Sequence, residues 1–209
     1  MKLLIFGSTG GTGQVVVQQS LEQGHHVTAF ARNPEKLTIQ HPNLTVIQGD
    51  VLDPIAVEKA VEHQDAVICI LGSGQQLTGT VRSEGTRQII QAMEKAGVER
   101  LICQSTLGTG DSWSNLNFYW KYVMFGFILR KVFADHQLQE RYIQQSHLDW
   151  TIVRPGALVE GDRTGHYRHG FPGTDRAIEL KISRADVADF ILKQLSNGLY
   201  LHQTPGLSY

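Results

Sequence analysis

A run of small residues, GSTGGTG, occupies positions 7–13 and directly follows the apolar sequence KLLIF. Glycine is costly inside a helix or strand because it loses the most backbone freedom on folding. In a turn that joins a strand to a helix, glycines let the backbone approach a pyrophosphate, which the first N–H groups of the helix bind. The G-x-x-G-x-x-G spacing therefore predicts a dinucleotide phosphate site, and a tight turn without a ligand is the alternative. The residues expected at this site, including three hydroxyl donors, are Gly7, Ser8, Thr9, Gly10, Gly11, Thr12 and Gly13.

The end of the second expected strand bears on the choice of dinucleotide. Folds that select NAD place an acid about 20 residues after the glycine loop, where it binds the ribose 2′-hydroxyl. Here Arg32 ends the strand and no acid occurs until Glu35. A guanidinium presents planar donors that match phosphate oxygens, so Arg32 predicts NADPH rather than NADH. A solvated surface arginine is the alternative.

Apolar segments alternate with amphipathic segments along the whole chain. The expected strands are 3–6, 26–31, 44–47, 66–71, 101–103 and 150–153, and the expected helices are 14–23, 54–61, 81–96, 135–145 and 184–195. This alternation predicts one α/β domain over residues 1–209, a Rossmann-type, doubly wound parallel sheet with helices on both faces. Ligands bind such sheets at the carboxyl ends of the strands. There Asp50 is placed to accept a hydrogen bond from adenine, and Leu71 and Gly72 offer a flat surface to adenine or ribose.

Composition and charge limit the partners, cellular location and metal sites that can be expected. The chain has 209 residues and a formal charge of -1, which gives no strong signal for nucleic acid or an anionic membrane, although a local patch can hide in a balanced total. The apolar run at the start is too short for a signal peptide, so a cytoplasmic location is expected. Cys69 and Cys103 lie in apolar runs without metal-ligand spacing, which predicts buried reduced thiols. The histidines show no metal spacing either, and no metal is expected.

An aromatic-rich insertion at about 109–134 contains the sequence WSNLNFYWKYVMFGFILRKVF over residues 113–133. Its apolar core is interrupted by charges and is too short to span a membrane. It follows the fifth expected strand, at the edge of the sheet where ligands bind. We therefore expect it to form a wall or lid of an apolar, ring-binding pocket. A packed helix, or a surface for a partner or a membrane, are the alternatives.

Taken together in this order, several motifs resemble one known family. They are IFGSTGGTG, VTAFARNPEKL, GDVLD, QDAVICILG, SEGTRQIIQAM, ADHQL, a strand ending in RPG, and ISRADVADFIL. The chain resembles the atypical short-chain dehydrogenase/reductase group, specifically its biliverdin-IXβ reductase/flavin reductase branch and NmrA-like, NAD(P)H-binding relatives. The resemblance covers nearly the whole chain.

The resemblance also implies roles for individual residues. It implies a phosphate loop at 7–13 and a 2′-phosphate contact at Arg32, and it assigns the adenine site and the next backbone contacts to Asp50, Val51, Leu71 and Gly72. It places Gln104, Ser105 and Thr106 beside the nicotinamide, with Ser105 or Thr106 as the catalytic hydroxyl. It places near the cofactor and against the nicotinamide amide His136, Pro155, Gly156, Ala157 and Leu158.

Two departures narrow the expected chemistry. Dehydrogenases of this group that act on alcohols use Tyr-x-x-x-Lys for proton transfer, and no tyrosine here has lysine at that spacing. Flavin reduction needs no such tyrosine, since orientation of two flat rings carries the reaction. The family's histidine after its Pro-Pro is Gly156 here. If that histidine assists tetrapyrrole reduction, its absence argues against biliverdin as a substrate more than against flavin.

The sequence therefore predicts an NADPH-dependent reductase of a planar aromatic small molecule. Free flavin is the favoured substrate rather than a tightly bound cofactor. The alternatives are a quinone or tetrapyrrole (biliverdin) reductase, or a non-catalytic NADP(H)-binding redox sensor that acts through a protein partner. A monomer without nucleic-acid partners or a transmembrane segment is expected.

Overall fold

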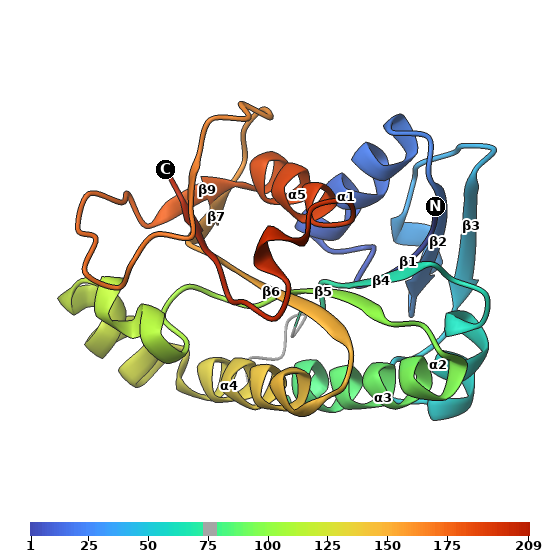
Figure 1. Cartoon of the computed structure of the whole chain (residues 1–209), viewed down its shortest axis with the longest axis horizontal. Helices are drawn as coiled ribbons and strands as arrows, with labels where there is room; N and C mark the ends of the chain where they lie inside the picture. Colours follow the sequence, from blue (N-terminus) through green and yellow to red (C-terminus); the bar gives the residue numbers. More distant parts are fainter. Residues whose placement is uncertain (73–78) are drawn as a thin grey trace.

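A mostly parallel, eight-stranded sheet forms the centre of the computed structural model, which describes residues 1–72 and 79–209 (Figure 1). Its strand order is β3-β2-β1-β4-β5-β6-β10-β8. The strands are β1 (Lys2–Phe6), β2 (His26–Ala31), β3 (Leu44–Gln48), β4 (Ala66–Cys69), β5 (Arg100–Gln104), β6 (Asp149–Pro155), β10 (Gly206–Ser208) and β8 (Arg168–His169). All neighbours run parallel except β10 and β8. The predicted single-domain Rossmann-type fold is confirmed.

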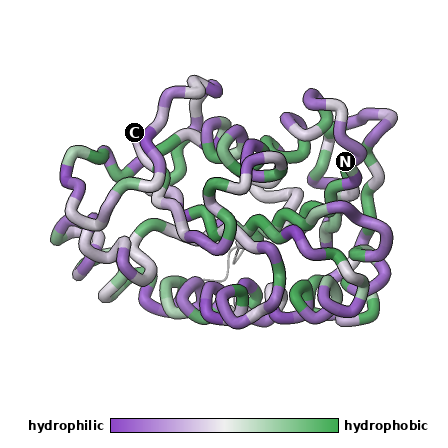
Figure 2. The backbone as a smooth tube through the Cα atoms, viewed as in Figure 1, coloured by the Kyte–Doolittle hydropathy of each residue, from purple (hydrophilic) through white to green (hydrophobic). Residues whose placement is uncertain are grey.

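Helices cover both faces of the sheet (Figure 1). One face carries α1 (Gly11–Glu22) and α5 (Arg184–Lys193), and the other carries α2 (Pro54–Val61), α3 (Val81–Ala96) and α4 (Arg130–Gln145). Because both faces are covered, the central strand β4 is apolar throughout and is buried at every position. Alternate residues of β1 enter opposite cores, Leu3 and Ile5 beneath α1 and α5, Leu4 and Phe6 beneath α2 and α3. Figure 2 shows this apolar centre between helices of mixed hydropathy.

Several element boundaries differ from the prediction. The helix expected from residue 14 begins at Gly11, with Gly10 as its N-cap, so the last glycines of the loop belong to its first turn. The helix expected from residue 135 begins at Arg130. Propensity disfavours glycine in a helix, and in α1 the close packing of Gly13 against the backbone of Gly7 overrides it. The strand expected over 66–71 ends at Cys69.

The C-terminal part of the chain adds strands that the sequence did not predict. They are β8 and β10 at the edge of the sheet and a separate parallel pair, β7 (Ala157–Val159) with β9 (Lys181–Ser183). Each is only two or three residues long, too short for hydrophobic periodicity to reveal. The β7–β9 pair brings residues about 180 against the end of β6, where a site is expected.

Short helical turns and a π-helix complete the fold. They are η1 (Pro34–Lys36), η2 (Gly110–Asn115), η3 (Tyr119–Ile128) and η4 (Gly198–Tyr200). The π-helix η3 lies within the predicted aromatic insertion and, with its neighbours, forms a third apolar cluster that contains Leu107, Leu116, Phe125, Phe133 and Ile178. Within the described residues, no helix has both the length and the apolar character needed to cross a bilayer.

Candidate active site

A cleft of about 480 Å³ opens at the carboxyl ends of β1, β2, β4 and β5. Of the residues that the sequence predicted for a site, most line it: Gly7, Thr9, Gly10, Gly11, Thr12, Gly13, Arg32, Val51, Leu71, Gly72, Gln104, Ser105, Thr106, His136, Pro155, Gly156 and Leu158. They come from segments that are far apart in sequence. The topology therefore brings the predicted phosphate, adenine and nicotinamide positions into one continuous groove.

Two glycines of the loop are required by the fold, because a side chain would clash there, whereas a third has room for a side chain. A Cβ on Gly13 would lie 2.1 Å from the carbonyl oxygen of Gly7, and Gly7 itself has a φ of +81°. Gly10 has an ordinary φ of -74°, and a Cβ there would meet only the Gly7 carbonyl at 3.4 Å. The backbone conformation and packing therefore require glycine at positions 7 and 13. They do not require it at position 10, which lines the cleft.

The N-terminus of α1 fits a phosphate group at this open space. Its N-cap, Gly10, has no side chain to cap the helix, so the first N–H groups lack the usual N-cap acceptor. A pyrophosphate over Gly10 would accept hydrogen bonds from these groups and would interact favourably with the helix dipole. The residues present therefore fit a dinucleotide.

Cations gather at the end of the cleft where the adenine is expected, which we call the adenine end. Arg32 is exposed at the end of β2, and Asn33 and Lys36 line the cleft beside it. The Arg32 side chain makes no hydrogen bond or ion pair with any residue in the described parts of the chain. Lys36 was not predicted, although a second cation four residues after Arg32, on the turn η1, is a readable signal. Two positive side chains here suit a 2′-phosphate.

Three predicted residues lie elsewhere. The Ser8 side chain is fully buried, and its hydroxyl donates to the Phe30 carbonyl at 3.1 Å, so it does not point toward the cleft. The Asp50 carboxylate accepts a hydrogen bond from the Leu52 N–H at 3.0 Å and is absent from the lining, so an adenine contact stays a prediction. Ala157 lines the neighbouring apolar cavity instead.

The end of the cleft where the nicotinamide is expected, which we call the nicotinamide end, contains buried polar atoms without partners among the described residues. Among the described residues, Ser105 Oγ, His136 Nδ1 and Gln104 Oε1 are buried without a hydrogen-bond partner. Buried polar groups are normally paired, so a ligand that supplies the complementary groups fits this place. Burial, followed by the positive charge of Arg82, lowers the pKa of His136 to about 3. His136 is therefore neutral at physiological pH and does not carry the imidazolium proton that a general acid would donate.

Arg82 is a lining residue that the sequence analysis missed. Its side chain is 11% exposed and lies 3.9 Å from Asp135, while its Nε and Nη1 have no hydrogen-bond partner among the described residues. Burial lowers its pKa, which Asp135 partly offsets. A cation in the first turn of a helix opposes the helix dipole. Arg82 occupies such a position in α3, and this unfavourable placement is the sequence feature that could have indicated a functional role.

A second, apolar cavity of about 210 Å³ joins the nicotinamide end. Five residues line both spaces: Thr106, His136, Pro155, Gly156 and Leu158. Trp120, Phe125 and Leu129 form part of its wall, so the geometry agrees with the wall expected from the aromatic insertion. No tyrosine of the described residues lines either space.

The fold itself requires Gly156 at the junction of the two spaces. A Cβ on Gly156 would lie 2.6 Å from the backbone carbon of Leu180, because the β7–β9 pair brings the two segments together. A histidine is therefore excluded at this position without movement of β9. The departure from the family pattern is a property of the local backbone.

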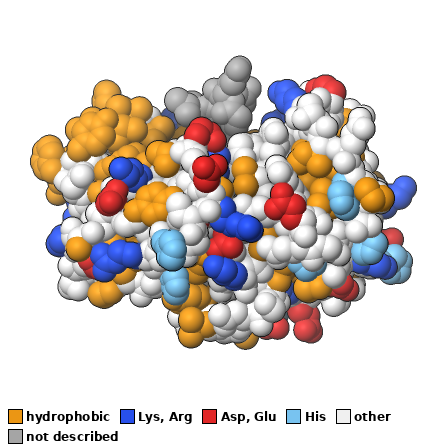
Figure 3. All heavy atoms as spheres, turned by 90° about the horizontal axis from the view of Figure 1, so that it is seen from above, with side chains coloured by type: hydrophobic (Ala, Val, Ile, Leu, Met, Phe, Trp, Pro, Cys, Tyr) orange, Lys and Arg blue, Asp and Glu red, His pale blue; other side chains and the backbone are white. Residues whose placement is uncertain are grey.

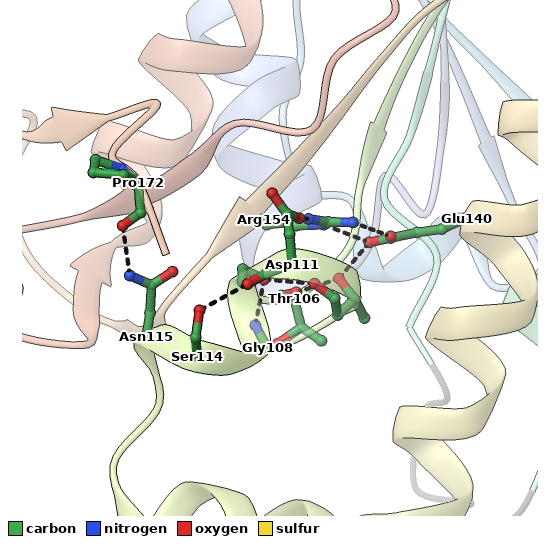
Figure 4. Close-up of polar contacts among 10 residues, drawn as sticks. Thr106, Gly108, Asp111, Ser114, Asn115, Glu140, Arg154 and Pro172 are labelled. Atoms are coloured by element: carbon green, nitrogen blue, oxygen red, sulfur yellow. Dashed lines mark hydrogen bonds and ion pairs between the residues drawn. The ribbon is translucent and has the colours of Figure 1, made fainter. Parts of the chain in front are cut away.

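A buried ion-pair network fixes the loop that carries the cavity (Figure 4). Arg154 on β6 donates from Nη2 to Glu140 Oε2 at 2.7 Å and from Nη1 to Asp111 Oδ1 at 2.5 Å. Thr109 Oγ1 donates to Glu140 Oε1 at 2.6 Å. The network ties the loop after β5 to both β6 and α4. Apart from the RPG motif that contains Arg154, no sequence pattern predicts this network.

Cys69 and Cys103 are both free and fully buried. They occupy paired positions on the adjacent strands β4 and β5. The predicted buried, reduced thiols are confirmed. Within the described part of the chain, no group of three or more His, Cys, Asp or Glu residues is arranged to hold a metal ion.

A comparison with protein families decides the class. The model of one family, described as NAD(P)H-binding, matches residues 7–198. The chain belongs to this NAD(P)H-binding family. The match covers the glycine loop, both cavities and the aromatic insertion, so the family assignment applies to the whole site.

Relatives of this NAD(P)H-binding protein include an assembly factor and two structurally solved proteins. Photosystem II assembly factor Ycf39 of Synechocystis is 26% identical over 165 residues, which are 77% of this chain but only 46% of that protein. The oxidoreductase ylbE of Lactococcus lactis is 27% identical with a TM-score of 0.84, covering 100% of this chain and 90% of that one. ChuY of Escherichia coli O157:H7, described as an anaerobillin reductase, is 28% identical with a TM-score of 0.80, covering 100% and 97%. Together with the family match, the two solved structures support an NAD(P)H-dependent oxidoreductase of the atypical short-chain dehydrogenase/reductase type.

Proposed function

We propose that this protein is an NADPH-dependent reductase that transfers hydride to a planar aromatic acceptor, with free flavin as the favoured acceptor. One observation carries the proposal: the apolar cavity and the polar cleft share Thr106, His136, Pro155, Gly156 and Leu158. A ring in the cavity would therefore meet the end of the cleft where the nicotinamide is expected. Apolar, aromatic walls with few polar groups are typical of sites for flat ligands.

The residues divide the work between binding and orientation. The N-terminus of α1 would hold the pyrophosphate, and Arg32 with Lys36 would hold the 2′-phosphate, which favours NADPH over NADH. When bound, the nicotinamide supplies the hydride. The Pro155–Leu158 backbone and Thr106 would position the rings, while Trp120 and Phe125 exclude water from one side. Among the described residues, no tyrosine lines either space to act as a proton donor, so we expect solvent to supply the acceptor's proton.

A tetrapyrrole acceptor is the second candidate. ChuY, described as an anaerobillin reductase, resembles this chain at 28% identity over its whole length. A linear tetrapyrrole is also flat and apolar over much of its surface, which suits the same cavity. Gly156 stands where the family's histidine is expected, so any tetrapyrrole reduction here would proceed without that side chain.

Steady-state oxidation of NADPH against a panel of acceptors tests the proposal. The panel contains riboflavin, FMN, FAD, a short-chain quinone and biliverdin. We expect turnover with flavins. Tight NADPH binding without turnover of any acceptor would instead favour a sensor that works through a protein partner. Turnover of the bilin alone would transfer the function to tetrapyrroles.

A pair of neighbouring variants assigns the acceptor to the apolar cavity. Trp120→Ala removes a ring from the cavity wall and should raise the KM for flavin about tenfold, leaving the NADPH Kd unchanged. Tyr119→Ala is the matched control, because that ring is exposed and does not line the cavity. Equal effects of the two substitutions would place the acceptor elsewhere.

A further inference from the structure

The outer face of the π-helix η3 exposes large apolar side chains. Phe127 is 85% exposed, Phe118 is 73% exposed and Tyr122 is 61% exposed, and smaller fractions of three further side chains are exposed: Tyr119, Val123 and Ile128. We call these six residues the aromatic face. Figure 3 shows hydrophobic side chains gathered at the end of the molecule where Figure 1 places this segment. Contiguous apolar surface of this kind marks an interaction site in a folded protein.

Within its own stretch of sequence, the charges beside the aromatic face have one sign. Lys121, Arg130 and Lys131 lie within or beside it, and residues 112–134 contain no aspartate or glutamate. None of the three cations forms an ion pair with any residue that the structure describes. The chain as a whole has a formal charge of -1, so this segment is a local positive region in a nearly neutral protein.

We propose that the aromatic face lies on an anionic lipid bilayer, with its rings in the headgroup region and its three cations against the lipid phosphates. Aromatic side chains favour this interface because their rings are apolar and, in tyrosine, one end is polar. A helix with an apolar face and adjacent lysine or arginine residues binds in the plane of the membrane rather than across it. No helix among the described residues is suited to crossing the membrane, which agrees with surface binding.

The charges argue against a second copy of the chain as the partner. In a twofold contact the aromatic faces would meet, and Lys121, Arg130 and Lys131 would approach the same cations of the other copy. The segment offers no carboxylate to neutralise them. An anionic bilayer removes this repulsion and adds attraction, worth about 1 kcal/mol per basic residue near the surface, or about fivefold in partitioning.

The aromatic face lies on the same helix that lines the apolar cavity, so membrane contact would occur next to the proposed acceptor site. The same helix turns Trp120 and Phe125 inward, where they line the apolar cavity and lie 5.6 Å apart between ring centroids. Membrane binding would thus take place on the outer side of the cavity wall. Binding of the aromatic face to a bilayer does not require the proposed reductase activity.

Co-sedimentation of the full chain with vesicles tests the proposal. We expect binding to phosphatidylcholine vesicles that contain phosphatidylglycerol, weak binding to phosphatidylcholine alone, and loss of binding in high salt. The double variant Arg130→Gln/Lys131→Gln should lower partitioning about 25-fold, at about fivefold per charge. Phe127→Ser should lower it by a similar order, because its exposed ring supplies apolar contact with the membrane.

Matched controls come from α2, at the opposite end of the molecule in Figure 1. Ile55 is 77% exposed and Lys59 is exposed, so Ile55→Ser and Lys59→Gln change the same properties outside the aromatic face. They should leave partitioning unchanged. NADPH affinity measured on every variant separates loss of the surface from loss of the fold.

Three outcomes would overturn the proposal. The first is an absence of binding to anionic vesicles. The second is equal loss of binding in the control variants. The third is a concentration-dependent dimer, detected by light scattering, that Phe127→Ser converts to a monomer, because the aromatic face would then be an interface between two copies.

Discussion

The two halves of the site are built in opposite ways. The phosphate half is mainly a continuous stretch, residues 7–13, whose backbone geometry and helix N-terminus form the binding surface. The acceptor half is assembled from separate segments, with Leu107, Trp120, Pro155 and Leu180 each coming from a different one. Backbone groups and charge dominate the first half, and apolar side chains dominate the second. Cofactor binding therefore depends mainly on a local stretch of the chain, whereas acceptor binding depends on tertiary packing.

The largest effect should come from Gly10→Val in the phosphate half. A branched side chain would fill the space over the N-terminus of α1, so NADPH binding should be abolished. The fold should survive, because the backbone φ of -74° is allowed and a Cβ meets only one atom, at 3.4 Å. Calorimetry for affinity and thermal unfolding for stability check this. Gly198→Val is the control, since a Cβ there meets nothing within 4 Å. Unchanged affinity in Gly10→Val would remove the phosphate-loop assignment.

Breaking the ion-pair network should affect the acceptor half. Arg154→Gln leaves Glu140 buried without its charged partner, and losing one member of a buried pair costs about 3–5 kcal/mol of unfolding free energy. Below the unfolding transition, we expect a higher KM for the acceptor and an unchanged Kd for NADPH. Chemical denaturation and steady-state kinetics measure the two quantities. A proportional loss of NADPH affinity would show that the halves are not separable.

Arg32→Ala should change cofactor selectivity without changing acceptor binding. A charge-assisted contact with the 2′-phosphate is worth about ten- to a hundredfold in affinity, and NADH has no such group. The ratio of kcat/KM for NADPH to that for NADH measures this effect with one flavin acceptor. Arg32→Lys should restore part of the ratio, and added salt should lower the wild-type value. If both cofactors weaken together, Arg32 is structural; if the wild type prefers NADH, the assignment of the 2′-phosphate site is wrong.

Much of this contrast was readable from the sequence. Glycine spacing and Arg32 reveal the phosphate half because a ligand-binding turn needs particular residue types at adjacent positions. The strand–helix alternation likewise predicts the sheet, its helices and the order in which they occur. Short strands such as β7 and β9 carry no periodic signal, so the approach of Leu180 to Gly156 could not be foreseen. The Arg154–Glu140 pair joins a strand to a helix through tertiary packing alone, and the buried orientation of Ser8 likewise depends on its contact with Phe30.

The hydroxyls between the halves should have a small effect. Ser105→Ala and Thr106→Ala should each lower flavin turnover about tenfold or less, because orientation rather than acid catalysis carries the reaction. Single-turnover rates under saturating NADPH measure this. A loss of about a thousandfold in either variant would assign that hydroxyl a proton-donor role and would contradict the proposed chemistry.

The smallest effect concerns pH and His136. Burial lowers its pKa to about 3, so kcat should show no histidine titration between about pH 5 and 8. Stability behaves differently. Between the unfolded pKa near 6.5 and the folded pKa near 3, the unfolded chain binds the proton more readily, so unfolding free energy falls as the pH is lowered through this window. His136→Gln should reduce this acid sensitivity, as denaturation at several pH values would show. A bell-shaped kcat profile that His136→Gln abolishes would make the histidine a proton donor.

Anaerobic single-turnover kinetics with deuterium at nicotinamide C4 would observe the proposed hydride transfer from NADPH to flavin itself. Enzyme loaded with NADPH is mixed with FMN, and the nicotinamide and flavin absorbances are followed together. We expect both signals to decay with one rate constant, and deuterium on the transferred side to slow this rate. Trp120→Ala should slow it, while Tyr119→Ala should not. Nicotinamide that stays reduced in the presence of FMN, or a rate insensitive to deuterium and to Trp120→Ala alike, would contradict hydride transfer across the junction of the two spaces.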